Sequence, residues 1–264
     1  MNYLIFGDVH GEAQTLLGLI LRAKGLLGED APLTIYSVGD LIDRGENSKR
    51  VLDLCIKYGV RLILGNHELW LHQWVTTGKV NSQIPLSPVM GGESTLESYG
   101  LNPKTLRSND ALAQALKRAV PQEHREYLKT AVPWDSIEHG GKVYFLSHGG
   151  ISAKVGKVIF EDPEVQERMD DPRLSNQTCA NILFDTLFNT APEQVFWLGA
   201  KKNNVYRLPE GCVQVFGHTP WRGGAEIADH YVALDTGCGT CPPYRLSGLL
   251  LHESGGREII SAAK

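Results

Sequence analysis

Short apolar segments that each end beside a glycine or serine and a polar side chain set the strongest limit on how this chain folds. The apolar segments lie at residues 3–6, 33–38, 61–64, 143–146 and 213–216. They lead into Gly7-Asp8, Gly39-Asp40, Gly65-Asn66, Ser147-His148 and Gly217-His218. Apolar runs of this length that stop at turn-forming residues are typical of buried strands. The chain is therefore predicted to carry metal-binding residue types at the carboxyl ends of several strands.

Helical patterns separate the first three apolar segments. Leucine and isoleucine recur at helical spacing in residues 12–24, and a second helical pattern covers residues 47–58. Strand, helix and strand in this order predict β-α-β units with parallel strands. Because open α/β sheets bind ligands at the carboxyl ends of their strands, we expect the chemistry of this α/β fold to be concentrated along one edge.

Residues 69–134 are predicted to be mainly helical, with a Gly91-Gly92 break and a helix at residues 109–120. We interpret about 70–135 as a cap or insertion beside the strand ends. No internal repeat or linker divides the sequence, so residues 1–264 are predicted to form a single domain.

A second variable region covers residues 151–207 and contains a predicted helix at 178–188. Two further apolar segments follow. Residues 231–234 lead into Asp235-Thr236-Gly237, and residues 246–252 are predicted to be a last hairpin strand.

Charge and composition limit the class of partner. The formal net charge of -4 provides no general attraction for a phosphate backbone, so nucleic acid is not the expected partner. No stretch approaches the roughly 20 apolar residues that span a bilayer, and the N-terminal run is too short for a signal peptide. The five irregularly spaced cysteines are typical of reduced thiols. We expect a cytoplasmic protein, without membrane association, that acts on small or protein-borne phosphates.

The polar residues at the strand ends form a candidate metal site. The set contains carboxylates, imidazoles and an amide but no thiolate, and consists of Asp8, His10, Asp40, Asn66, His148 and His218. Mn, Fe and Zn are bound by such mixtures of oxygen and nitrogen ligands. One divalent ion seldom needs so many ligands, whereas two ions that share a carboxylate would use all of them. A binuclear centre is therefore predicted.

Five motifs in this order resemble the signature blocks of the calcineurin-like metallophosphoesterases. They are Gly7-Asp8-Val9-His10-Gly11, Gly39-Asp40-Leu41-Ile42-Asp43-Arg44-Gly45, Gly65-Asn66-His67-Glu68, Ser147-His148-Gly149-Gly150 and Gly217-His218-Thr219. The Asp-Arg-Gly ending of the second block resembles the phosphoprotein phosphatase superfamily. Residues 91–100 and the Asp235-Thr236-Gly237 motif resemble its bacterial branch of Ser/Thr protein phosphatases and diadenosine tetraphosphatases.

The resemblance implies a fold and a metal centre. The fold would be a two-sheet β-sandwich of the metallophosphoesterase type, flanked by helices and with helical insertions. The first metal would be held by Asp8, His10 and Asp40. The second metal would be held by Asp40, Asn66, His148 and His218, with Asp40 bridging the two. Two divalent ions are expected, with Mn as the first choice and Fe and Zn as alternatives.

The resemblance also implies how the chain acts on phosphate. A hydroxide held between the two metals would attack phosphorus without a covalent enzyme intermediate. His67 would protonate the leaving oxygen, and Asp43 would orient His67. Arg44 and Asn66 would bind the substrate, Arg44 through two phosphate oxygens.

One feature departs from the pattern of these relatives. They usually supply a second phosphate-binding arginine shortly before the Gly-His-Thr block, often after a tryptophan. Here Phe196-Trp197 is followed by no arginine until Arg207. Lys201, Lys202 or Arg207 could replace it, but lysine offers a point charge where arginine offers a planar fork.

The predicted activity is hydrolysis of phosphomonoesters by a Ser/Thr protein phosphatase-like enzyme, on a phosphorylated protein or a small phosphoester. The alternative activity is cleavage of a dinucleoside polyphosphate such as diadenosine tetraphosphate. A non-catalytic binding scaffold is the third hypothesis, and it is disfavoured because every expected ligand is present. Cys238-Gly239-Thr240-Cys241 has no second cysteine pair and is interpreted as a turn.

Overall fold

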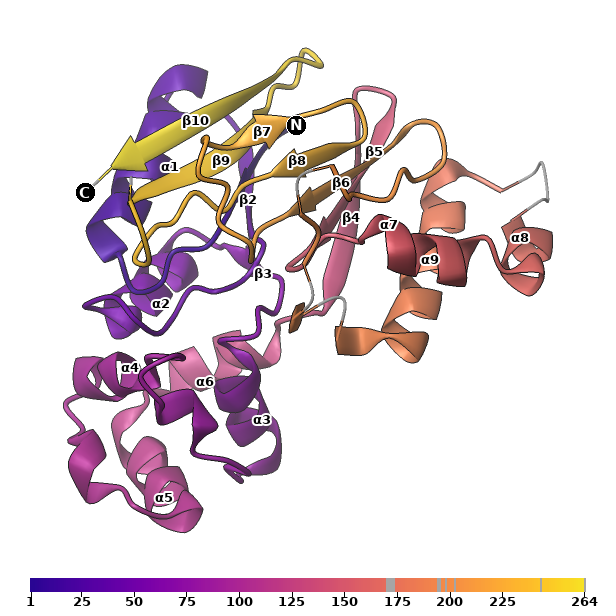
Figure 1. The fold of residues 1–264 in the computed structure, drawn as a ribbon. Coiled ribbons are helices and arrows are strands. Elements are labelled where there is room, and N and C mark those ends of the chain that lie inside the picture. The colour runs from indigo at the N-terminus through magenta and orange to yellow at the C-terminus, as the bar shows by residue number, and fades with distance from the viewer. Residues whose placement is uncertain (170–173, 194–195, 198, 202, 243, 264) are drawn as a thin grey trace.

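The computed structural model of the chain describes residues 1–169, 174–193, 196–197, 199–201, 203–242 and 244–263. Two β-sheets and the helices that cover them make up this part of the chain (Figure 1). None of the helices in these ranges is long and apolar enough to cross a membrane.

The first sheet contains the strands nearest the N-terminus. Its strands lie in the order β10 (Arg257–Ala263), β9 (Arg245–Leu251), β1 (Asn2–Phe6), β2 (Leu33–Ser37) and β3 (Arg61–Leu62). β1, β2 and β3 run parallel, whereas β9 is antiparallel to both β1 and β10. The parallel strands therefore end at the same edge of the sheet, as the sequence predicts.

The second sheet is built in the same way. Its strands lie in the order β4 (Trp134–His139), β5 (Lys142–Ser147), β6 (Cys212–Phe216), β8 (Tyr231–Ala233) and β7 (Glu226–Ile227). β5, β6 and β8 are parallel, and the two edge strands β4 and β7 are antiparallel to their neighbours. The strands that precede His148 and His218 thus also end at a common edge.

The two sheets pack face to face. Ile5 and Tyr36 of the first sheet share one buried apolar cluster with Tyr144 and Val215 of the second. Leu4, which is adjacent to Ile5 in β1, belongs instead to the cluster that includes the helices. This alternation follows from the two-residue period of a strand, and it explains why the strands are apolar on both faces.

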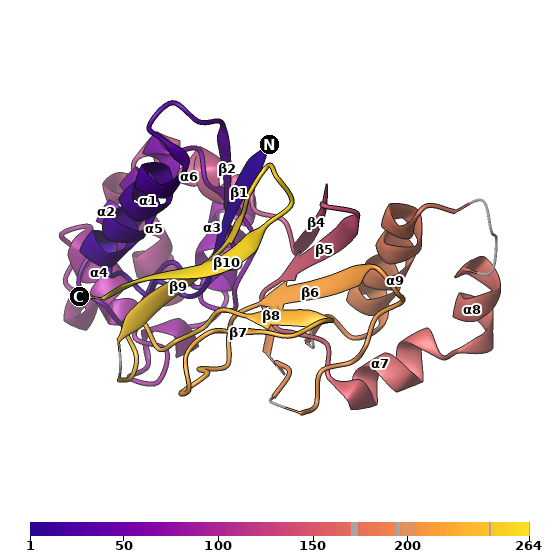
Figure 2. The same cartoon turned by 90° about the horizontal axis from the view of Figure 1, so that it is seen from above.

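Helices cover the outer faces of both sheets. They are α1 (Ala13–Leu27), α2 (Ser48–Lys57), α7 (Ala153–Phe160), α8 (Pro163–Met169) and α9 (Asn176–Thr190). α1 packs against β9 and β10, and α9 packs against β4 and β5. The ring of Phe184 in α9 stacks on Phe145 in β5 with the centroids 4.7 Å apart. Seen from above, the layers are helices, sheet, sheet and helices (Figure 2).

A further helical layer lies between β3 and β4 in the sequence. It consists of α3 (Leu69–Thr77), η1 (Ile84–Leu86), α4 (Gly92–Ser98), η2 (Pro103–Thr105), α5 (Asn109–Ala119) and α6 (Gln122–Lys129). α6 packs against α2 and α3, and α4 packs against α2 (Figure 1). This layer occupies the segment that the sequence led us to interpret as a cap or insertion.

The two-sheet α/β architecture is confirmed, but three strands, β4, β7 and β10, were not predicted. The expectation that residues 246–252 form the last strand is wrong, because β9 is followed by β10. β4 and β10 are both edge strands and both carry charged residues, among them Asp135 in β4 and Glu258 in β10. A strand with a solvent-facing side lacks the continuous apolar run that identified the buried strands.

The stacked pair formed by Phe145 and Phe184 gives a stability prediction. Phe184 is fully buried, so Phe184→Ala should lower the free energy of unfolding by about 3–5 kcal/mol, measured by urea denaturation. Phe188→Ala in the same helix removes a half-buried ring and should cost less. Equal losses for the two variants would contradict the placement of α9 on the second sheet.

Candidate metal centre

The loops that follow β2 and β3 are joined by one buried carboxylate. Glu68, which is fully buried, accepts hydrogen bonds from the backbone N–H groups of Gly65 at 3.0 Å, Asp40 at 2.8 Å, Leu41 at 2.8 Å and Ile42 at 3.3 Å. These bonds hold the turn after β2 against the turn after β3. The side chains of Asp40 and Asn66 are thereby brought to the same point.

Several residues of the centre have left-handed backbone conformations. The φ angles are positive at His10 (45°), Asp40 (53°), Asp43 (70°), Arg44 (67°) and His218 (67°). Such conformations are costly for residues with a side chain, and they cluster at functional sites where the surrounding structure enforces them. The strand-end turns are therefore held in a strained shape that aims these side chains inward.

One group of donor atoms converges around Asn66. Its Oδ1 atom lies 2.9 Å from His148 Nε2 and 3.0 Å from His218 Nδ1, and the two imidazole nitrogens are 3.1 Å apart. Asp40 Oδ1 lies 3.3 Å from His148 Nε2. Donor atoms bound to one cation at about 2.1 Å lie roughly 3 Å apart from one another, so this spacing suits a metal ion.

The outer hydrogen bonds of the two histidines favour the same conclusion. His148 Nδ1 lies 2.8 Å from the carbonyl oxygen of Val38, and His218 Nε2 lies 3.0 Å from that of Trp197. A carbonyl oxygen only accepts, so each of these ring nitrogens carries the proton. In the neutral rings the lone pairs of the other nitrogens then face the Asn66 oxygen, and acceptors that converge in this way are matched by a cation.

A second group lies on the other side of Asp40. His10 Nε2 is 3.6 Å from Asp40 Oδ2 and 4.0 Å from Asp8 Oδ2, while its Nδ1 faces the Ile42 carbonyl oxygen at 3.0 Å. His67 Nε2 is 3.9 Å from Asp40 Oδ2. His10, Asp40 and His67 form one group that could hold a metal ion, and Asp40, His148 and His218 form another. Asp40 is common to both.

The electrostatics of the two groups call for positive charge. Burial raises the pKa of Asp8 well above its usual value, and the nearby carboxylates of Asp235 and Asp40 raise it further. Burial lowers the pKa of His148, but Asp40 and Asp8 outweigh this effect and raise it to about 10. Two divalent cations would relieve this repulsion between carboxylates and would take the place of the proton that His148 otherwise binds.

His10 and His218 are suited to bind a metal. Burial lowers the pKa of His10 to about 3. Burial and the neighbouring His148 lower the pKa of His218 to about 4. Both imidazoles are therefore neutral at pH 7, which is the form that binds metals. The residues present fit a pair of divalent ions.

His67 is oriented by a short chain of side chains. Its Nδ1 atom lies 2.9 Å from Asp43 Oδ2, and Thr95 Oγ1 donates to Asp43 Oδ1 at 2.6 Å. Thr95 Oγ1 is also 2.9 Å from Ser48 Oγ. All four side chains are buried. Thr95 is part of α4, so the helical layer after β3 reaches into the centre.

Arg44 extends over the centre from the turn after β2. It is exposed, and its Nη1 atom lies 2.9 Å from His10 Nε2. Its backbone N–H donates to the carbonyl oxygen of Gly91 at 3.0 Å, so the helical layer also fixes this turn. An exposed guanidinium beside the metal groups can reach the oxygens of a bound phosphate.

Residues 1–239 match the model of the calcineurin-like phosphoesterase family. The chain belongs to this family. Metallophosphoesterases bind two divalent metal ions, and this chain carries His and Asp clusters that could hold metal ions.

The names of two curated relatives of this chain describe enzymes that cleave phosphate chains. The zinc-dependent endopolyphosphatase of Saccharomyces cerevisiae is 26% identical over 161 residues, which cover 57% of this chain and 47% of the relative. A symmetrical bis(5'-nucleosyl)-tetraphosphatase of Enterobacter is 40% identical over 73 residues, which cover 27% of this chain and 25% of the relative. This phosphoesterase thus spans less than half the length of these relatives.

The fold of this phosphoesterase is also found in solved structures. A candidate diadenosine tetraphosphatase superposes with a TM-score of 0.52 at 20% sequence identity, and the match covers 99% of this chain and 93% of that one. At this level of identity the likeness concerns the fold alone.

Three residues of the centre were not predicted from the sequence. Glu68 stood in a quoted motif without a role, although it is the anchor of two loops. Asp235 is buried near Asp8, and burial raises its pKa to about 6 against the hydrogen bond from the Gly237 N–H. Thr95 lies far from the other residues in sequence. The Asp235-Thr236-Gly237 motif was a usable signal for Asp235, because it follows an apolar run in the same way as the other strand ends.

The residues considered as a replacement for the second arginine have different locations. Lys201 lines a pocket together with Thr219. Arg207 lies near His230, where burial and then the charge of Arg207 lower the pKa of the imidazole. Lys202 lies outside the described residues.

Neither Cys238 nor Cys241 forms a disulfide, and the N–H of Cys241 donates to the Gly237 carbonyl oxygen at 3.0 Å. The turn interpretation of this segment is therefore confirmed.

The contact between Thr95 and Asp43 gives a prediction about catalysis. Thr95→Val removes the hydroxyl that holds Asp43, so kcat for a phosphate monoester should fall by about 10- to 100-fold with little change in KM. Thr95→Ser keeps the hydroxyl and should retain most of the activity. Ser98→Ala removes another hydroxyl from α4 that binds the Lys49 N–H and the Thr95 carbonyl oxygen, and serves as the control. Equal losses in Thr95→Val and Ser98→Ala would exclude a positioning role for Thr95.

Proposed function

We propose that this phosphoesterase hydrolyses phosphomonoesters, with phosphoserine and phosphothreonine esters of proteins as the favoured class. The observation that carries the proposal is the convergence of acceptor atoms on both sides of Asp40, with Arg44 and the His67–Asp43 pair beside them. A phosphoryl group needs these three functions, which are metal ligands, a cationic holder and a proton donor.

We propose the metal ligands as follows. Asp8, His10 and Asp40 would hold one ion, and Asp40, Asn66, His148 and His218 would hold the other. When bound, two such ions lower the pKa of water and stabilise charge on phosphate oxygens. Because the set combines carboxylate, amide and imidazole groups without thiolate, we propose Mn, with Fe and Zn as alternatives.

The side chains around the ligands have separate tasks in the proposal. Arg44 holds two oxygens of the phosphate through its planar fork and offsets their charge. The Asn66 side chain would bind the substrate together with Arg44. His67 donates a proton from Nε2 to the leaving oxygen, since its Nδ1 is engaged by Asp43. The remainder of the substrate would extend over an apolar pocket of about 550 Å³ that is lined by Asn66 together with Trp70, Met90 and Trp197.

Cleavage of a dinucleoside polyphosphate is the second candidate. It is supported by the sequence relatives, since symmetrical bis(5'-nucleosyl)-tetraphosphatases match with 38–44% identity over 72–73 residues. The same metal groups and the same His67 would serve a phosphoanhydride, whose leaving group is a phosphate oxygen. A longer phosphate chain would require additional cationic side chains beyond Arg44.

We further propose that residues 1–264 form a single domain with an insertion at about 70–135, acting in the cytoplasm. A single buried apolar cluster that includes Leu4 of β1 and Leu116 of α5 supports the domain proposal. The odd number and irregular spacing of the five cysteines favour reduced thiols, which supports a reducing compartment. Limited proteolysis that released the 70–135 segment as an independently folded unit would contradict the single domain.

The proposed function predicts dependence on metal and a preference among substrates. Chelation should abolish turnover, Mn should restore it, and Asp40→Asn should bind fewer than two ions per chain by elemental analysis. On one Mn-loaded preparation, a phosphoserine peptide should have a higher kcat/KM than diadenosine tetraphosphate. The reverse order would favour the second candidate, and undiminished turnover by metal-free protein would contradict both.

The position of His67 predicts an effect that depends on the leaving group. His67→Asn should lower kcat for an alkyl phosphate by about 10²- to 10⁴-fold. The loss should be smaller for nitrophenyl phosphate, whose leaving group needs no proton, and the metal content should not change. Since His67 Nε2 is 3.9 Å from Asp40 Oδ2, a fall in metal content would instead assign His67 to the ligands.

A further inference from the structure

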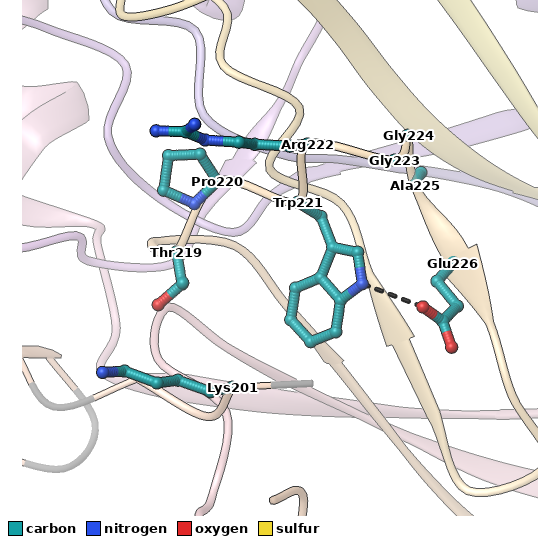
Figure 3. Close-up of a pocket in the computed structure, with 9 residues that line it drawn as sticks. All are labelled: Lys201, Thr219, Pro220, Trp221, Arg222, Gly223, Gly224, Ala225 and Glu226. Atoms are coloured by element: carbon teal, nitrogen blue, oxygen red, sulfur yellow. Dashed lines mark hydrogen bonds between the residues drawn. The ribbon is translucent and has the colours of Figure 1, made fainter. Parts of the chain in front are cut away.

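A pocket of about 530 Å³ lies directly beyond the last candidate metal ligand in the sequence. It is lined by Lys201 and by residues 219–226, which form the loop that follows His218 (Figure 3). Neither the metal groups nor the His67–Asp43 pair needs this pocket. The first residue of this loop, Thr219, directly follows His218 in the sequence. The pocket therefore begins beside a candidate metal ligand.

The charges around this pocket are separated. Lys201 and Arg222 are exposed, and neither makes an ion pair within the part of the chain that the structure describes. Figure 3 shows their cationic ends on the same side of the pocket as Thr219, with Glu226 at the other end. The Glu226 carboxylate accepts from Trp221 Nε1 at 2.8 Å and from the Tyr231 hydroxyl at 2.9 Å. The cationic side is thus available to a ligand while the acidic group is occupied.

The two cations are attached to backbone that is fixed against the metal centre. A methyl group on Gly199 would lie 2.6 Å from Thr219 Oγ1 and 2.8 Å from the His218 ring, so the segment leading to Lys201 is pressed onto these residues. The N–H of Trp221, which precedes Arg222, donates to the Asp235 carbonyl oxygen at 2.8 Å. Both side chains therefore start from defined positions next to His218 and Asp235.

We propose that Lys201, Arg222 and the Thr219 hydroxyl form a subsite for a second phosphate group of substrates that carry a chain of phosphates. Figure 3 draws the Arg222 guanidinium and the Lys201 ammonium at opposite edges with Thr219 between them, so a chain of phosphates along this side would receive charge-assisted hydrogen bonds from one cation at each edge and a neutral one from the hydroxyl. The volume accommodates more than one phosphate group. The inference rests on the second candidate activity, because a monoester with a single phosphate has no group to place here.

This subsite differs from the replacement that the sequence suggested. The candidates that the sequence offers, Lys201, Lys202 and Arg207, all precede the Gly217-His218-Thr219 block. The structure instead combines Lys201 from before the block with Arg222 from after it. Lys201 and Arg222 are far apart in the sequence, and only the fold places them at the same pocket.

The test uses the Mn-loaded full chain with free Mn held constant, and three substrates: nitrophenyl phosphate, tripolyphosphate and diadenosine tetraphosphate. In the Lys201→Ala/Arg222→Ala variant, kcat/KM for both phosphate chains should fall by roughly 10- to 100-fold relative to kcat/KM for nitrophenyl phosphate. Most of the fall should be in KM, and it should shrink as salt is raised. A fall for diadenosine tetraphosphate alone would contradict a phosphate subsite and would indicate contacts with the nucleoside.

The Lys117→Ala/Arg118→Ala variant is the matched control, since it removes the same two charges from the exposed face of α5. It should leave the ratio of the substrates unchanged. An equal fall in both double variants would show a general charge effect and overturn the subsite. Turnover of nitrophenyl phosphate without any turnover of phosphate chains would overturn the subsite while leaving phosphomonoester hydrolysis intact. If the unmodified protein turned over none of the three substrates, the proposed function itself would be contradicted.

Discussion

The geometry of the centre depends on the buried carboxylate of Glu68. It accepts hydrogen bonds from the backbone N–H groups of Gly65 and of residues 40–42, and so it joins the turns that follow β2 and β3. Burial and the neighbouring Asp40 raise the pKa of Glu68 to about 7, so ionising this group is costly and its four backbone donors offset that cost. The bonds leave the Asp40 side chain free to face both metal groups.

The sandwich of two sheets supplies the rigidity that this arrangement requires. Left-handed backbone at His10, Asp40 and His218 and converging acceptor atoms at Asn66 both raise the free energy of the folded chain. The apolar cluster between the sheets and the one beneath the helices stabilise the strands from which these turns start. Metal ions, once bound, would offset the remaining electrostatic cost and add to the stability of the fold.

Much of the fold and of the candidate site could be predicted from sequence because the features involved are local. Apolar runs that stop at Gly-Asp or Gly-Asn predict buried strands with polar ends, and β1, β2, β5 and β6 are observed there. The roles of Glu68 and Thr95 depend on contacts between distant segments, which no local pattern encodes. The same holds for Arg222, whose relation to Lys201 arises from the path of two loops. β4, β7 and β10 were missed because edge strands tolerate charged residues.

The contacts of α4 with the centre have a consequence for communication within the molecule. Thr95 donates a hydrogen bond to Asp43, and the Gly91 carbonyl oxygen accepts one from the Arg44 N–H, so residues 91–95 contact both the proposed partner of His67 and the proposed phosphate-binding arginine. A displacement of α4 would therefore change the positions of Asp43 and Arg44 together. Such coupling is reciprocal, so a phosphate held by Arg44, as proposed, would also stabilise the position of α4. The α3–α6 layer is thus joined to the centre through Thr95 and Gly91 and also packs against α2.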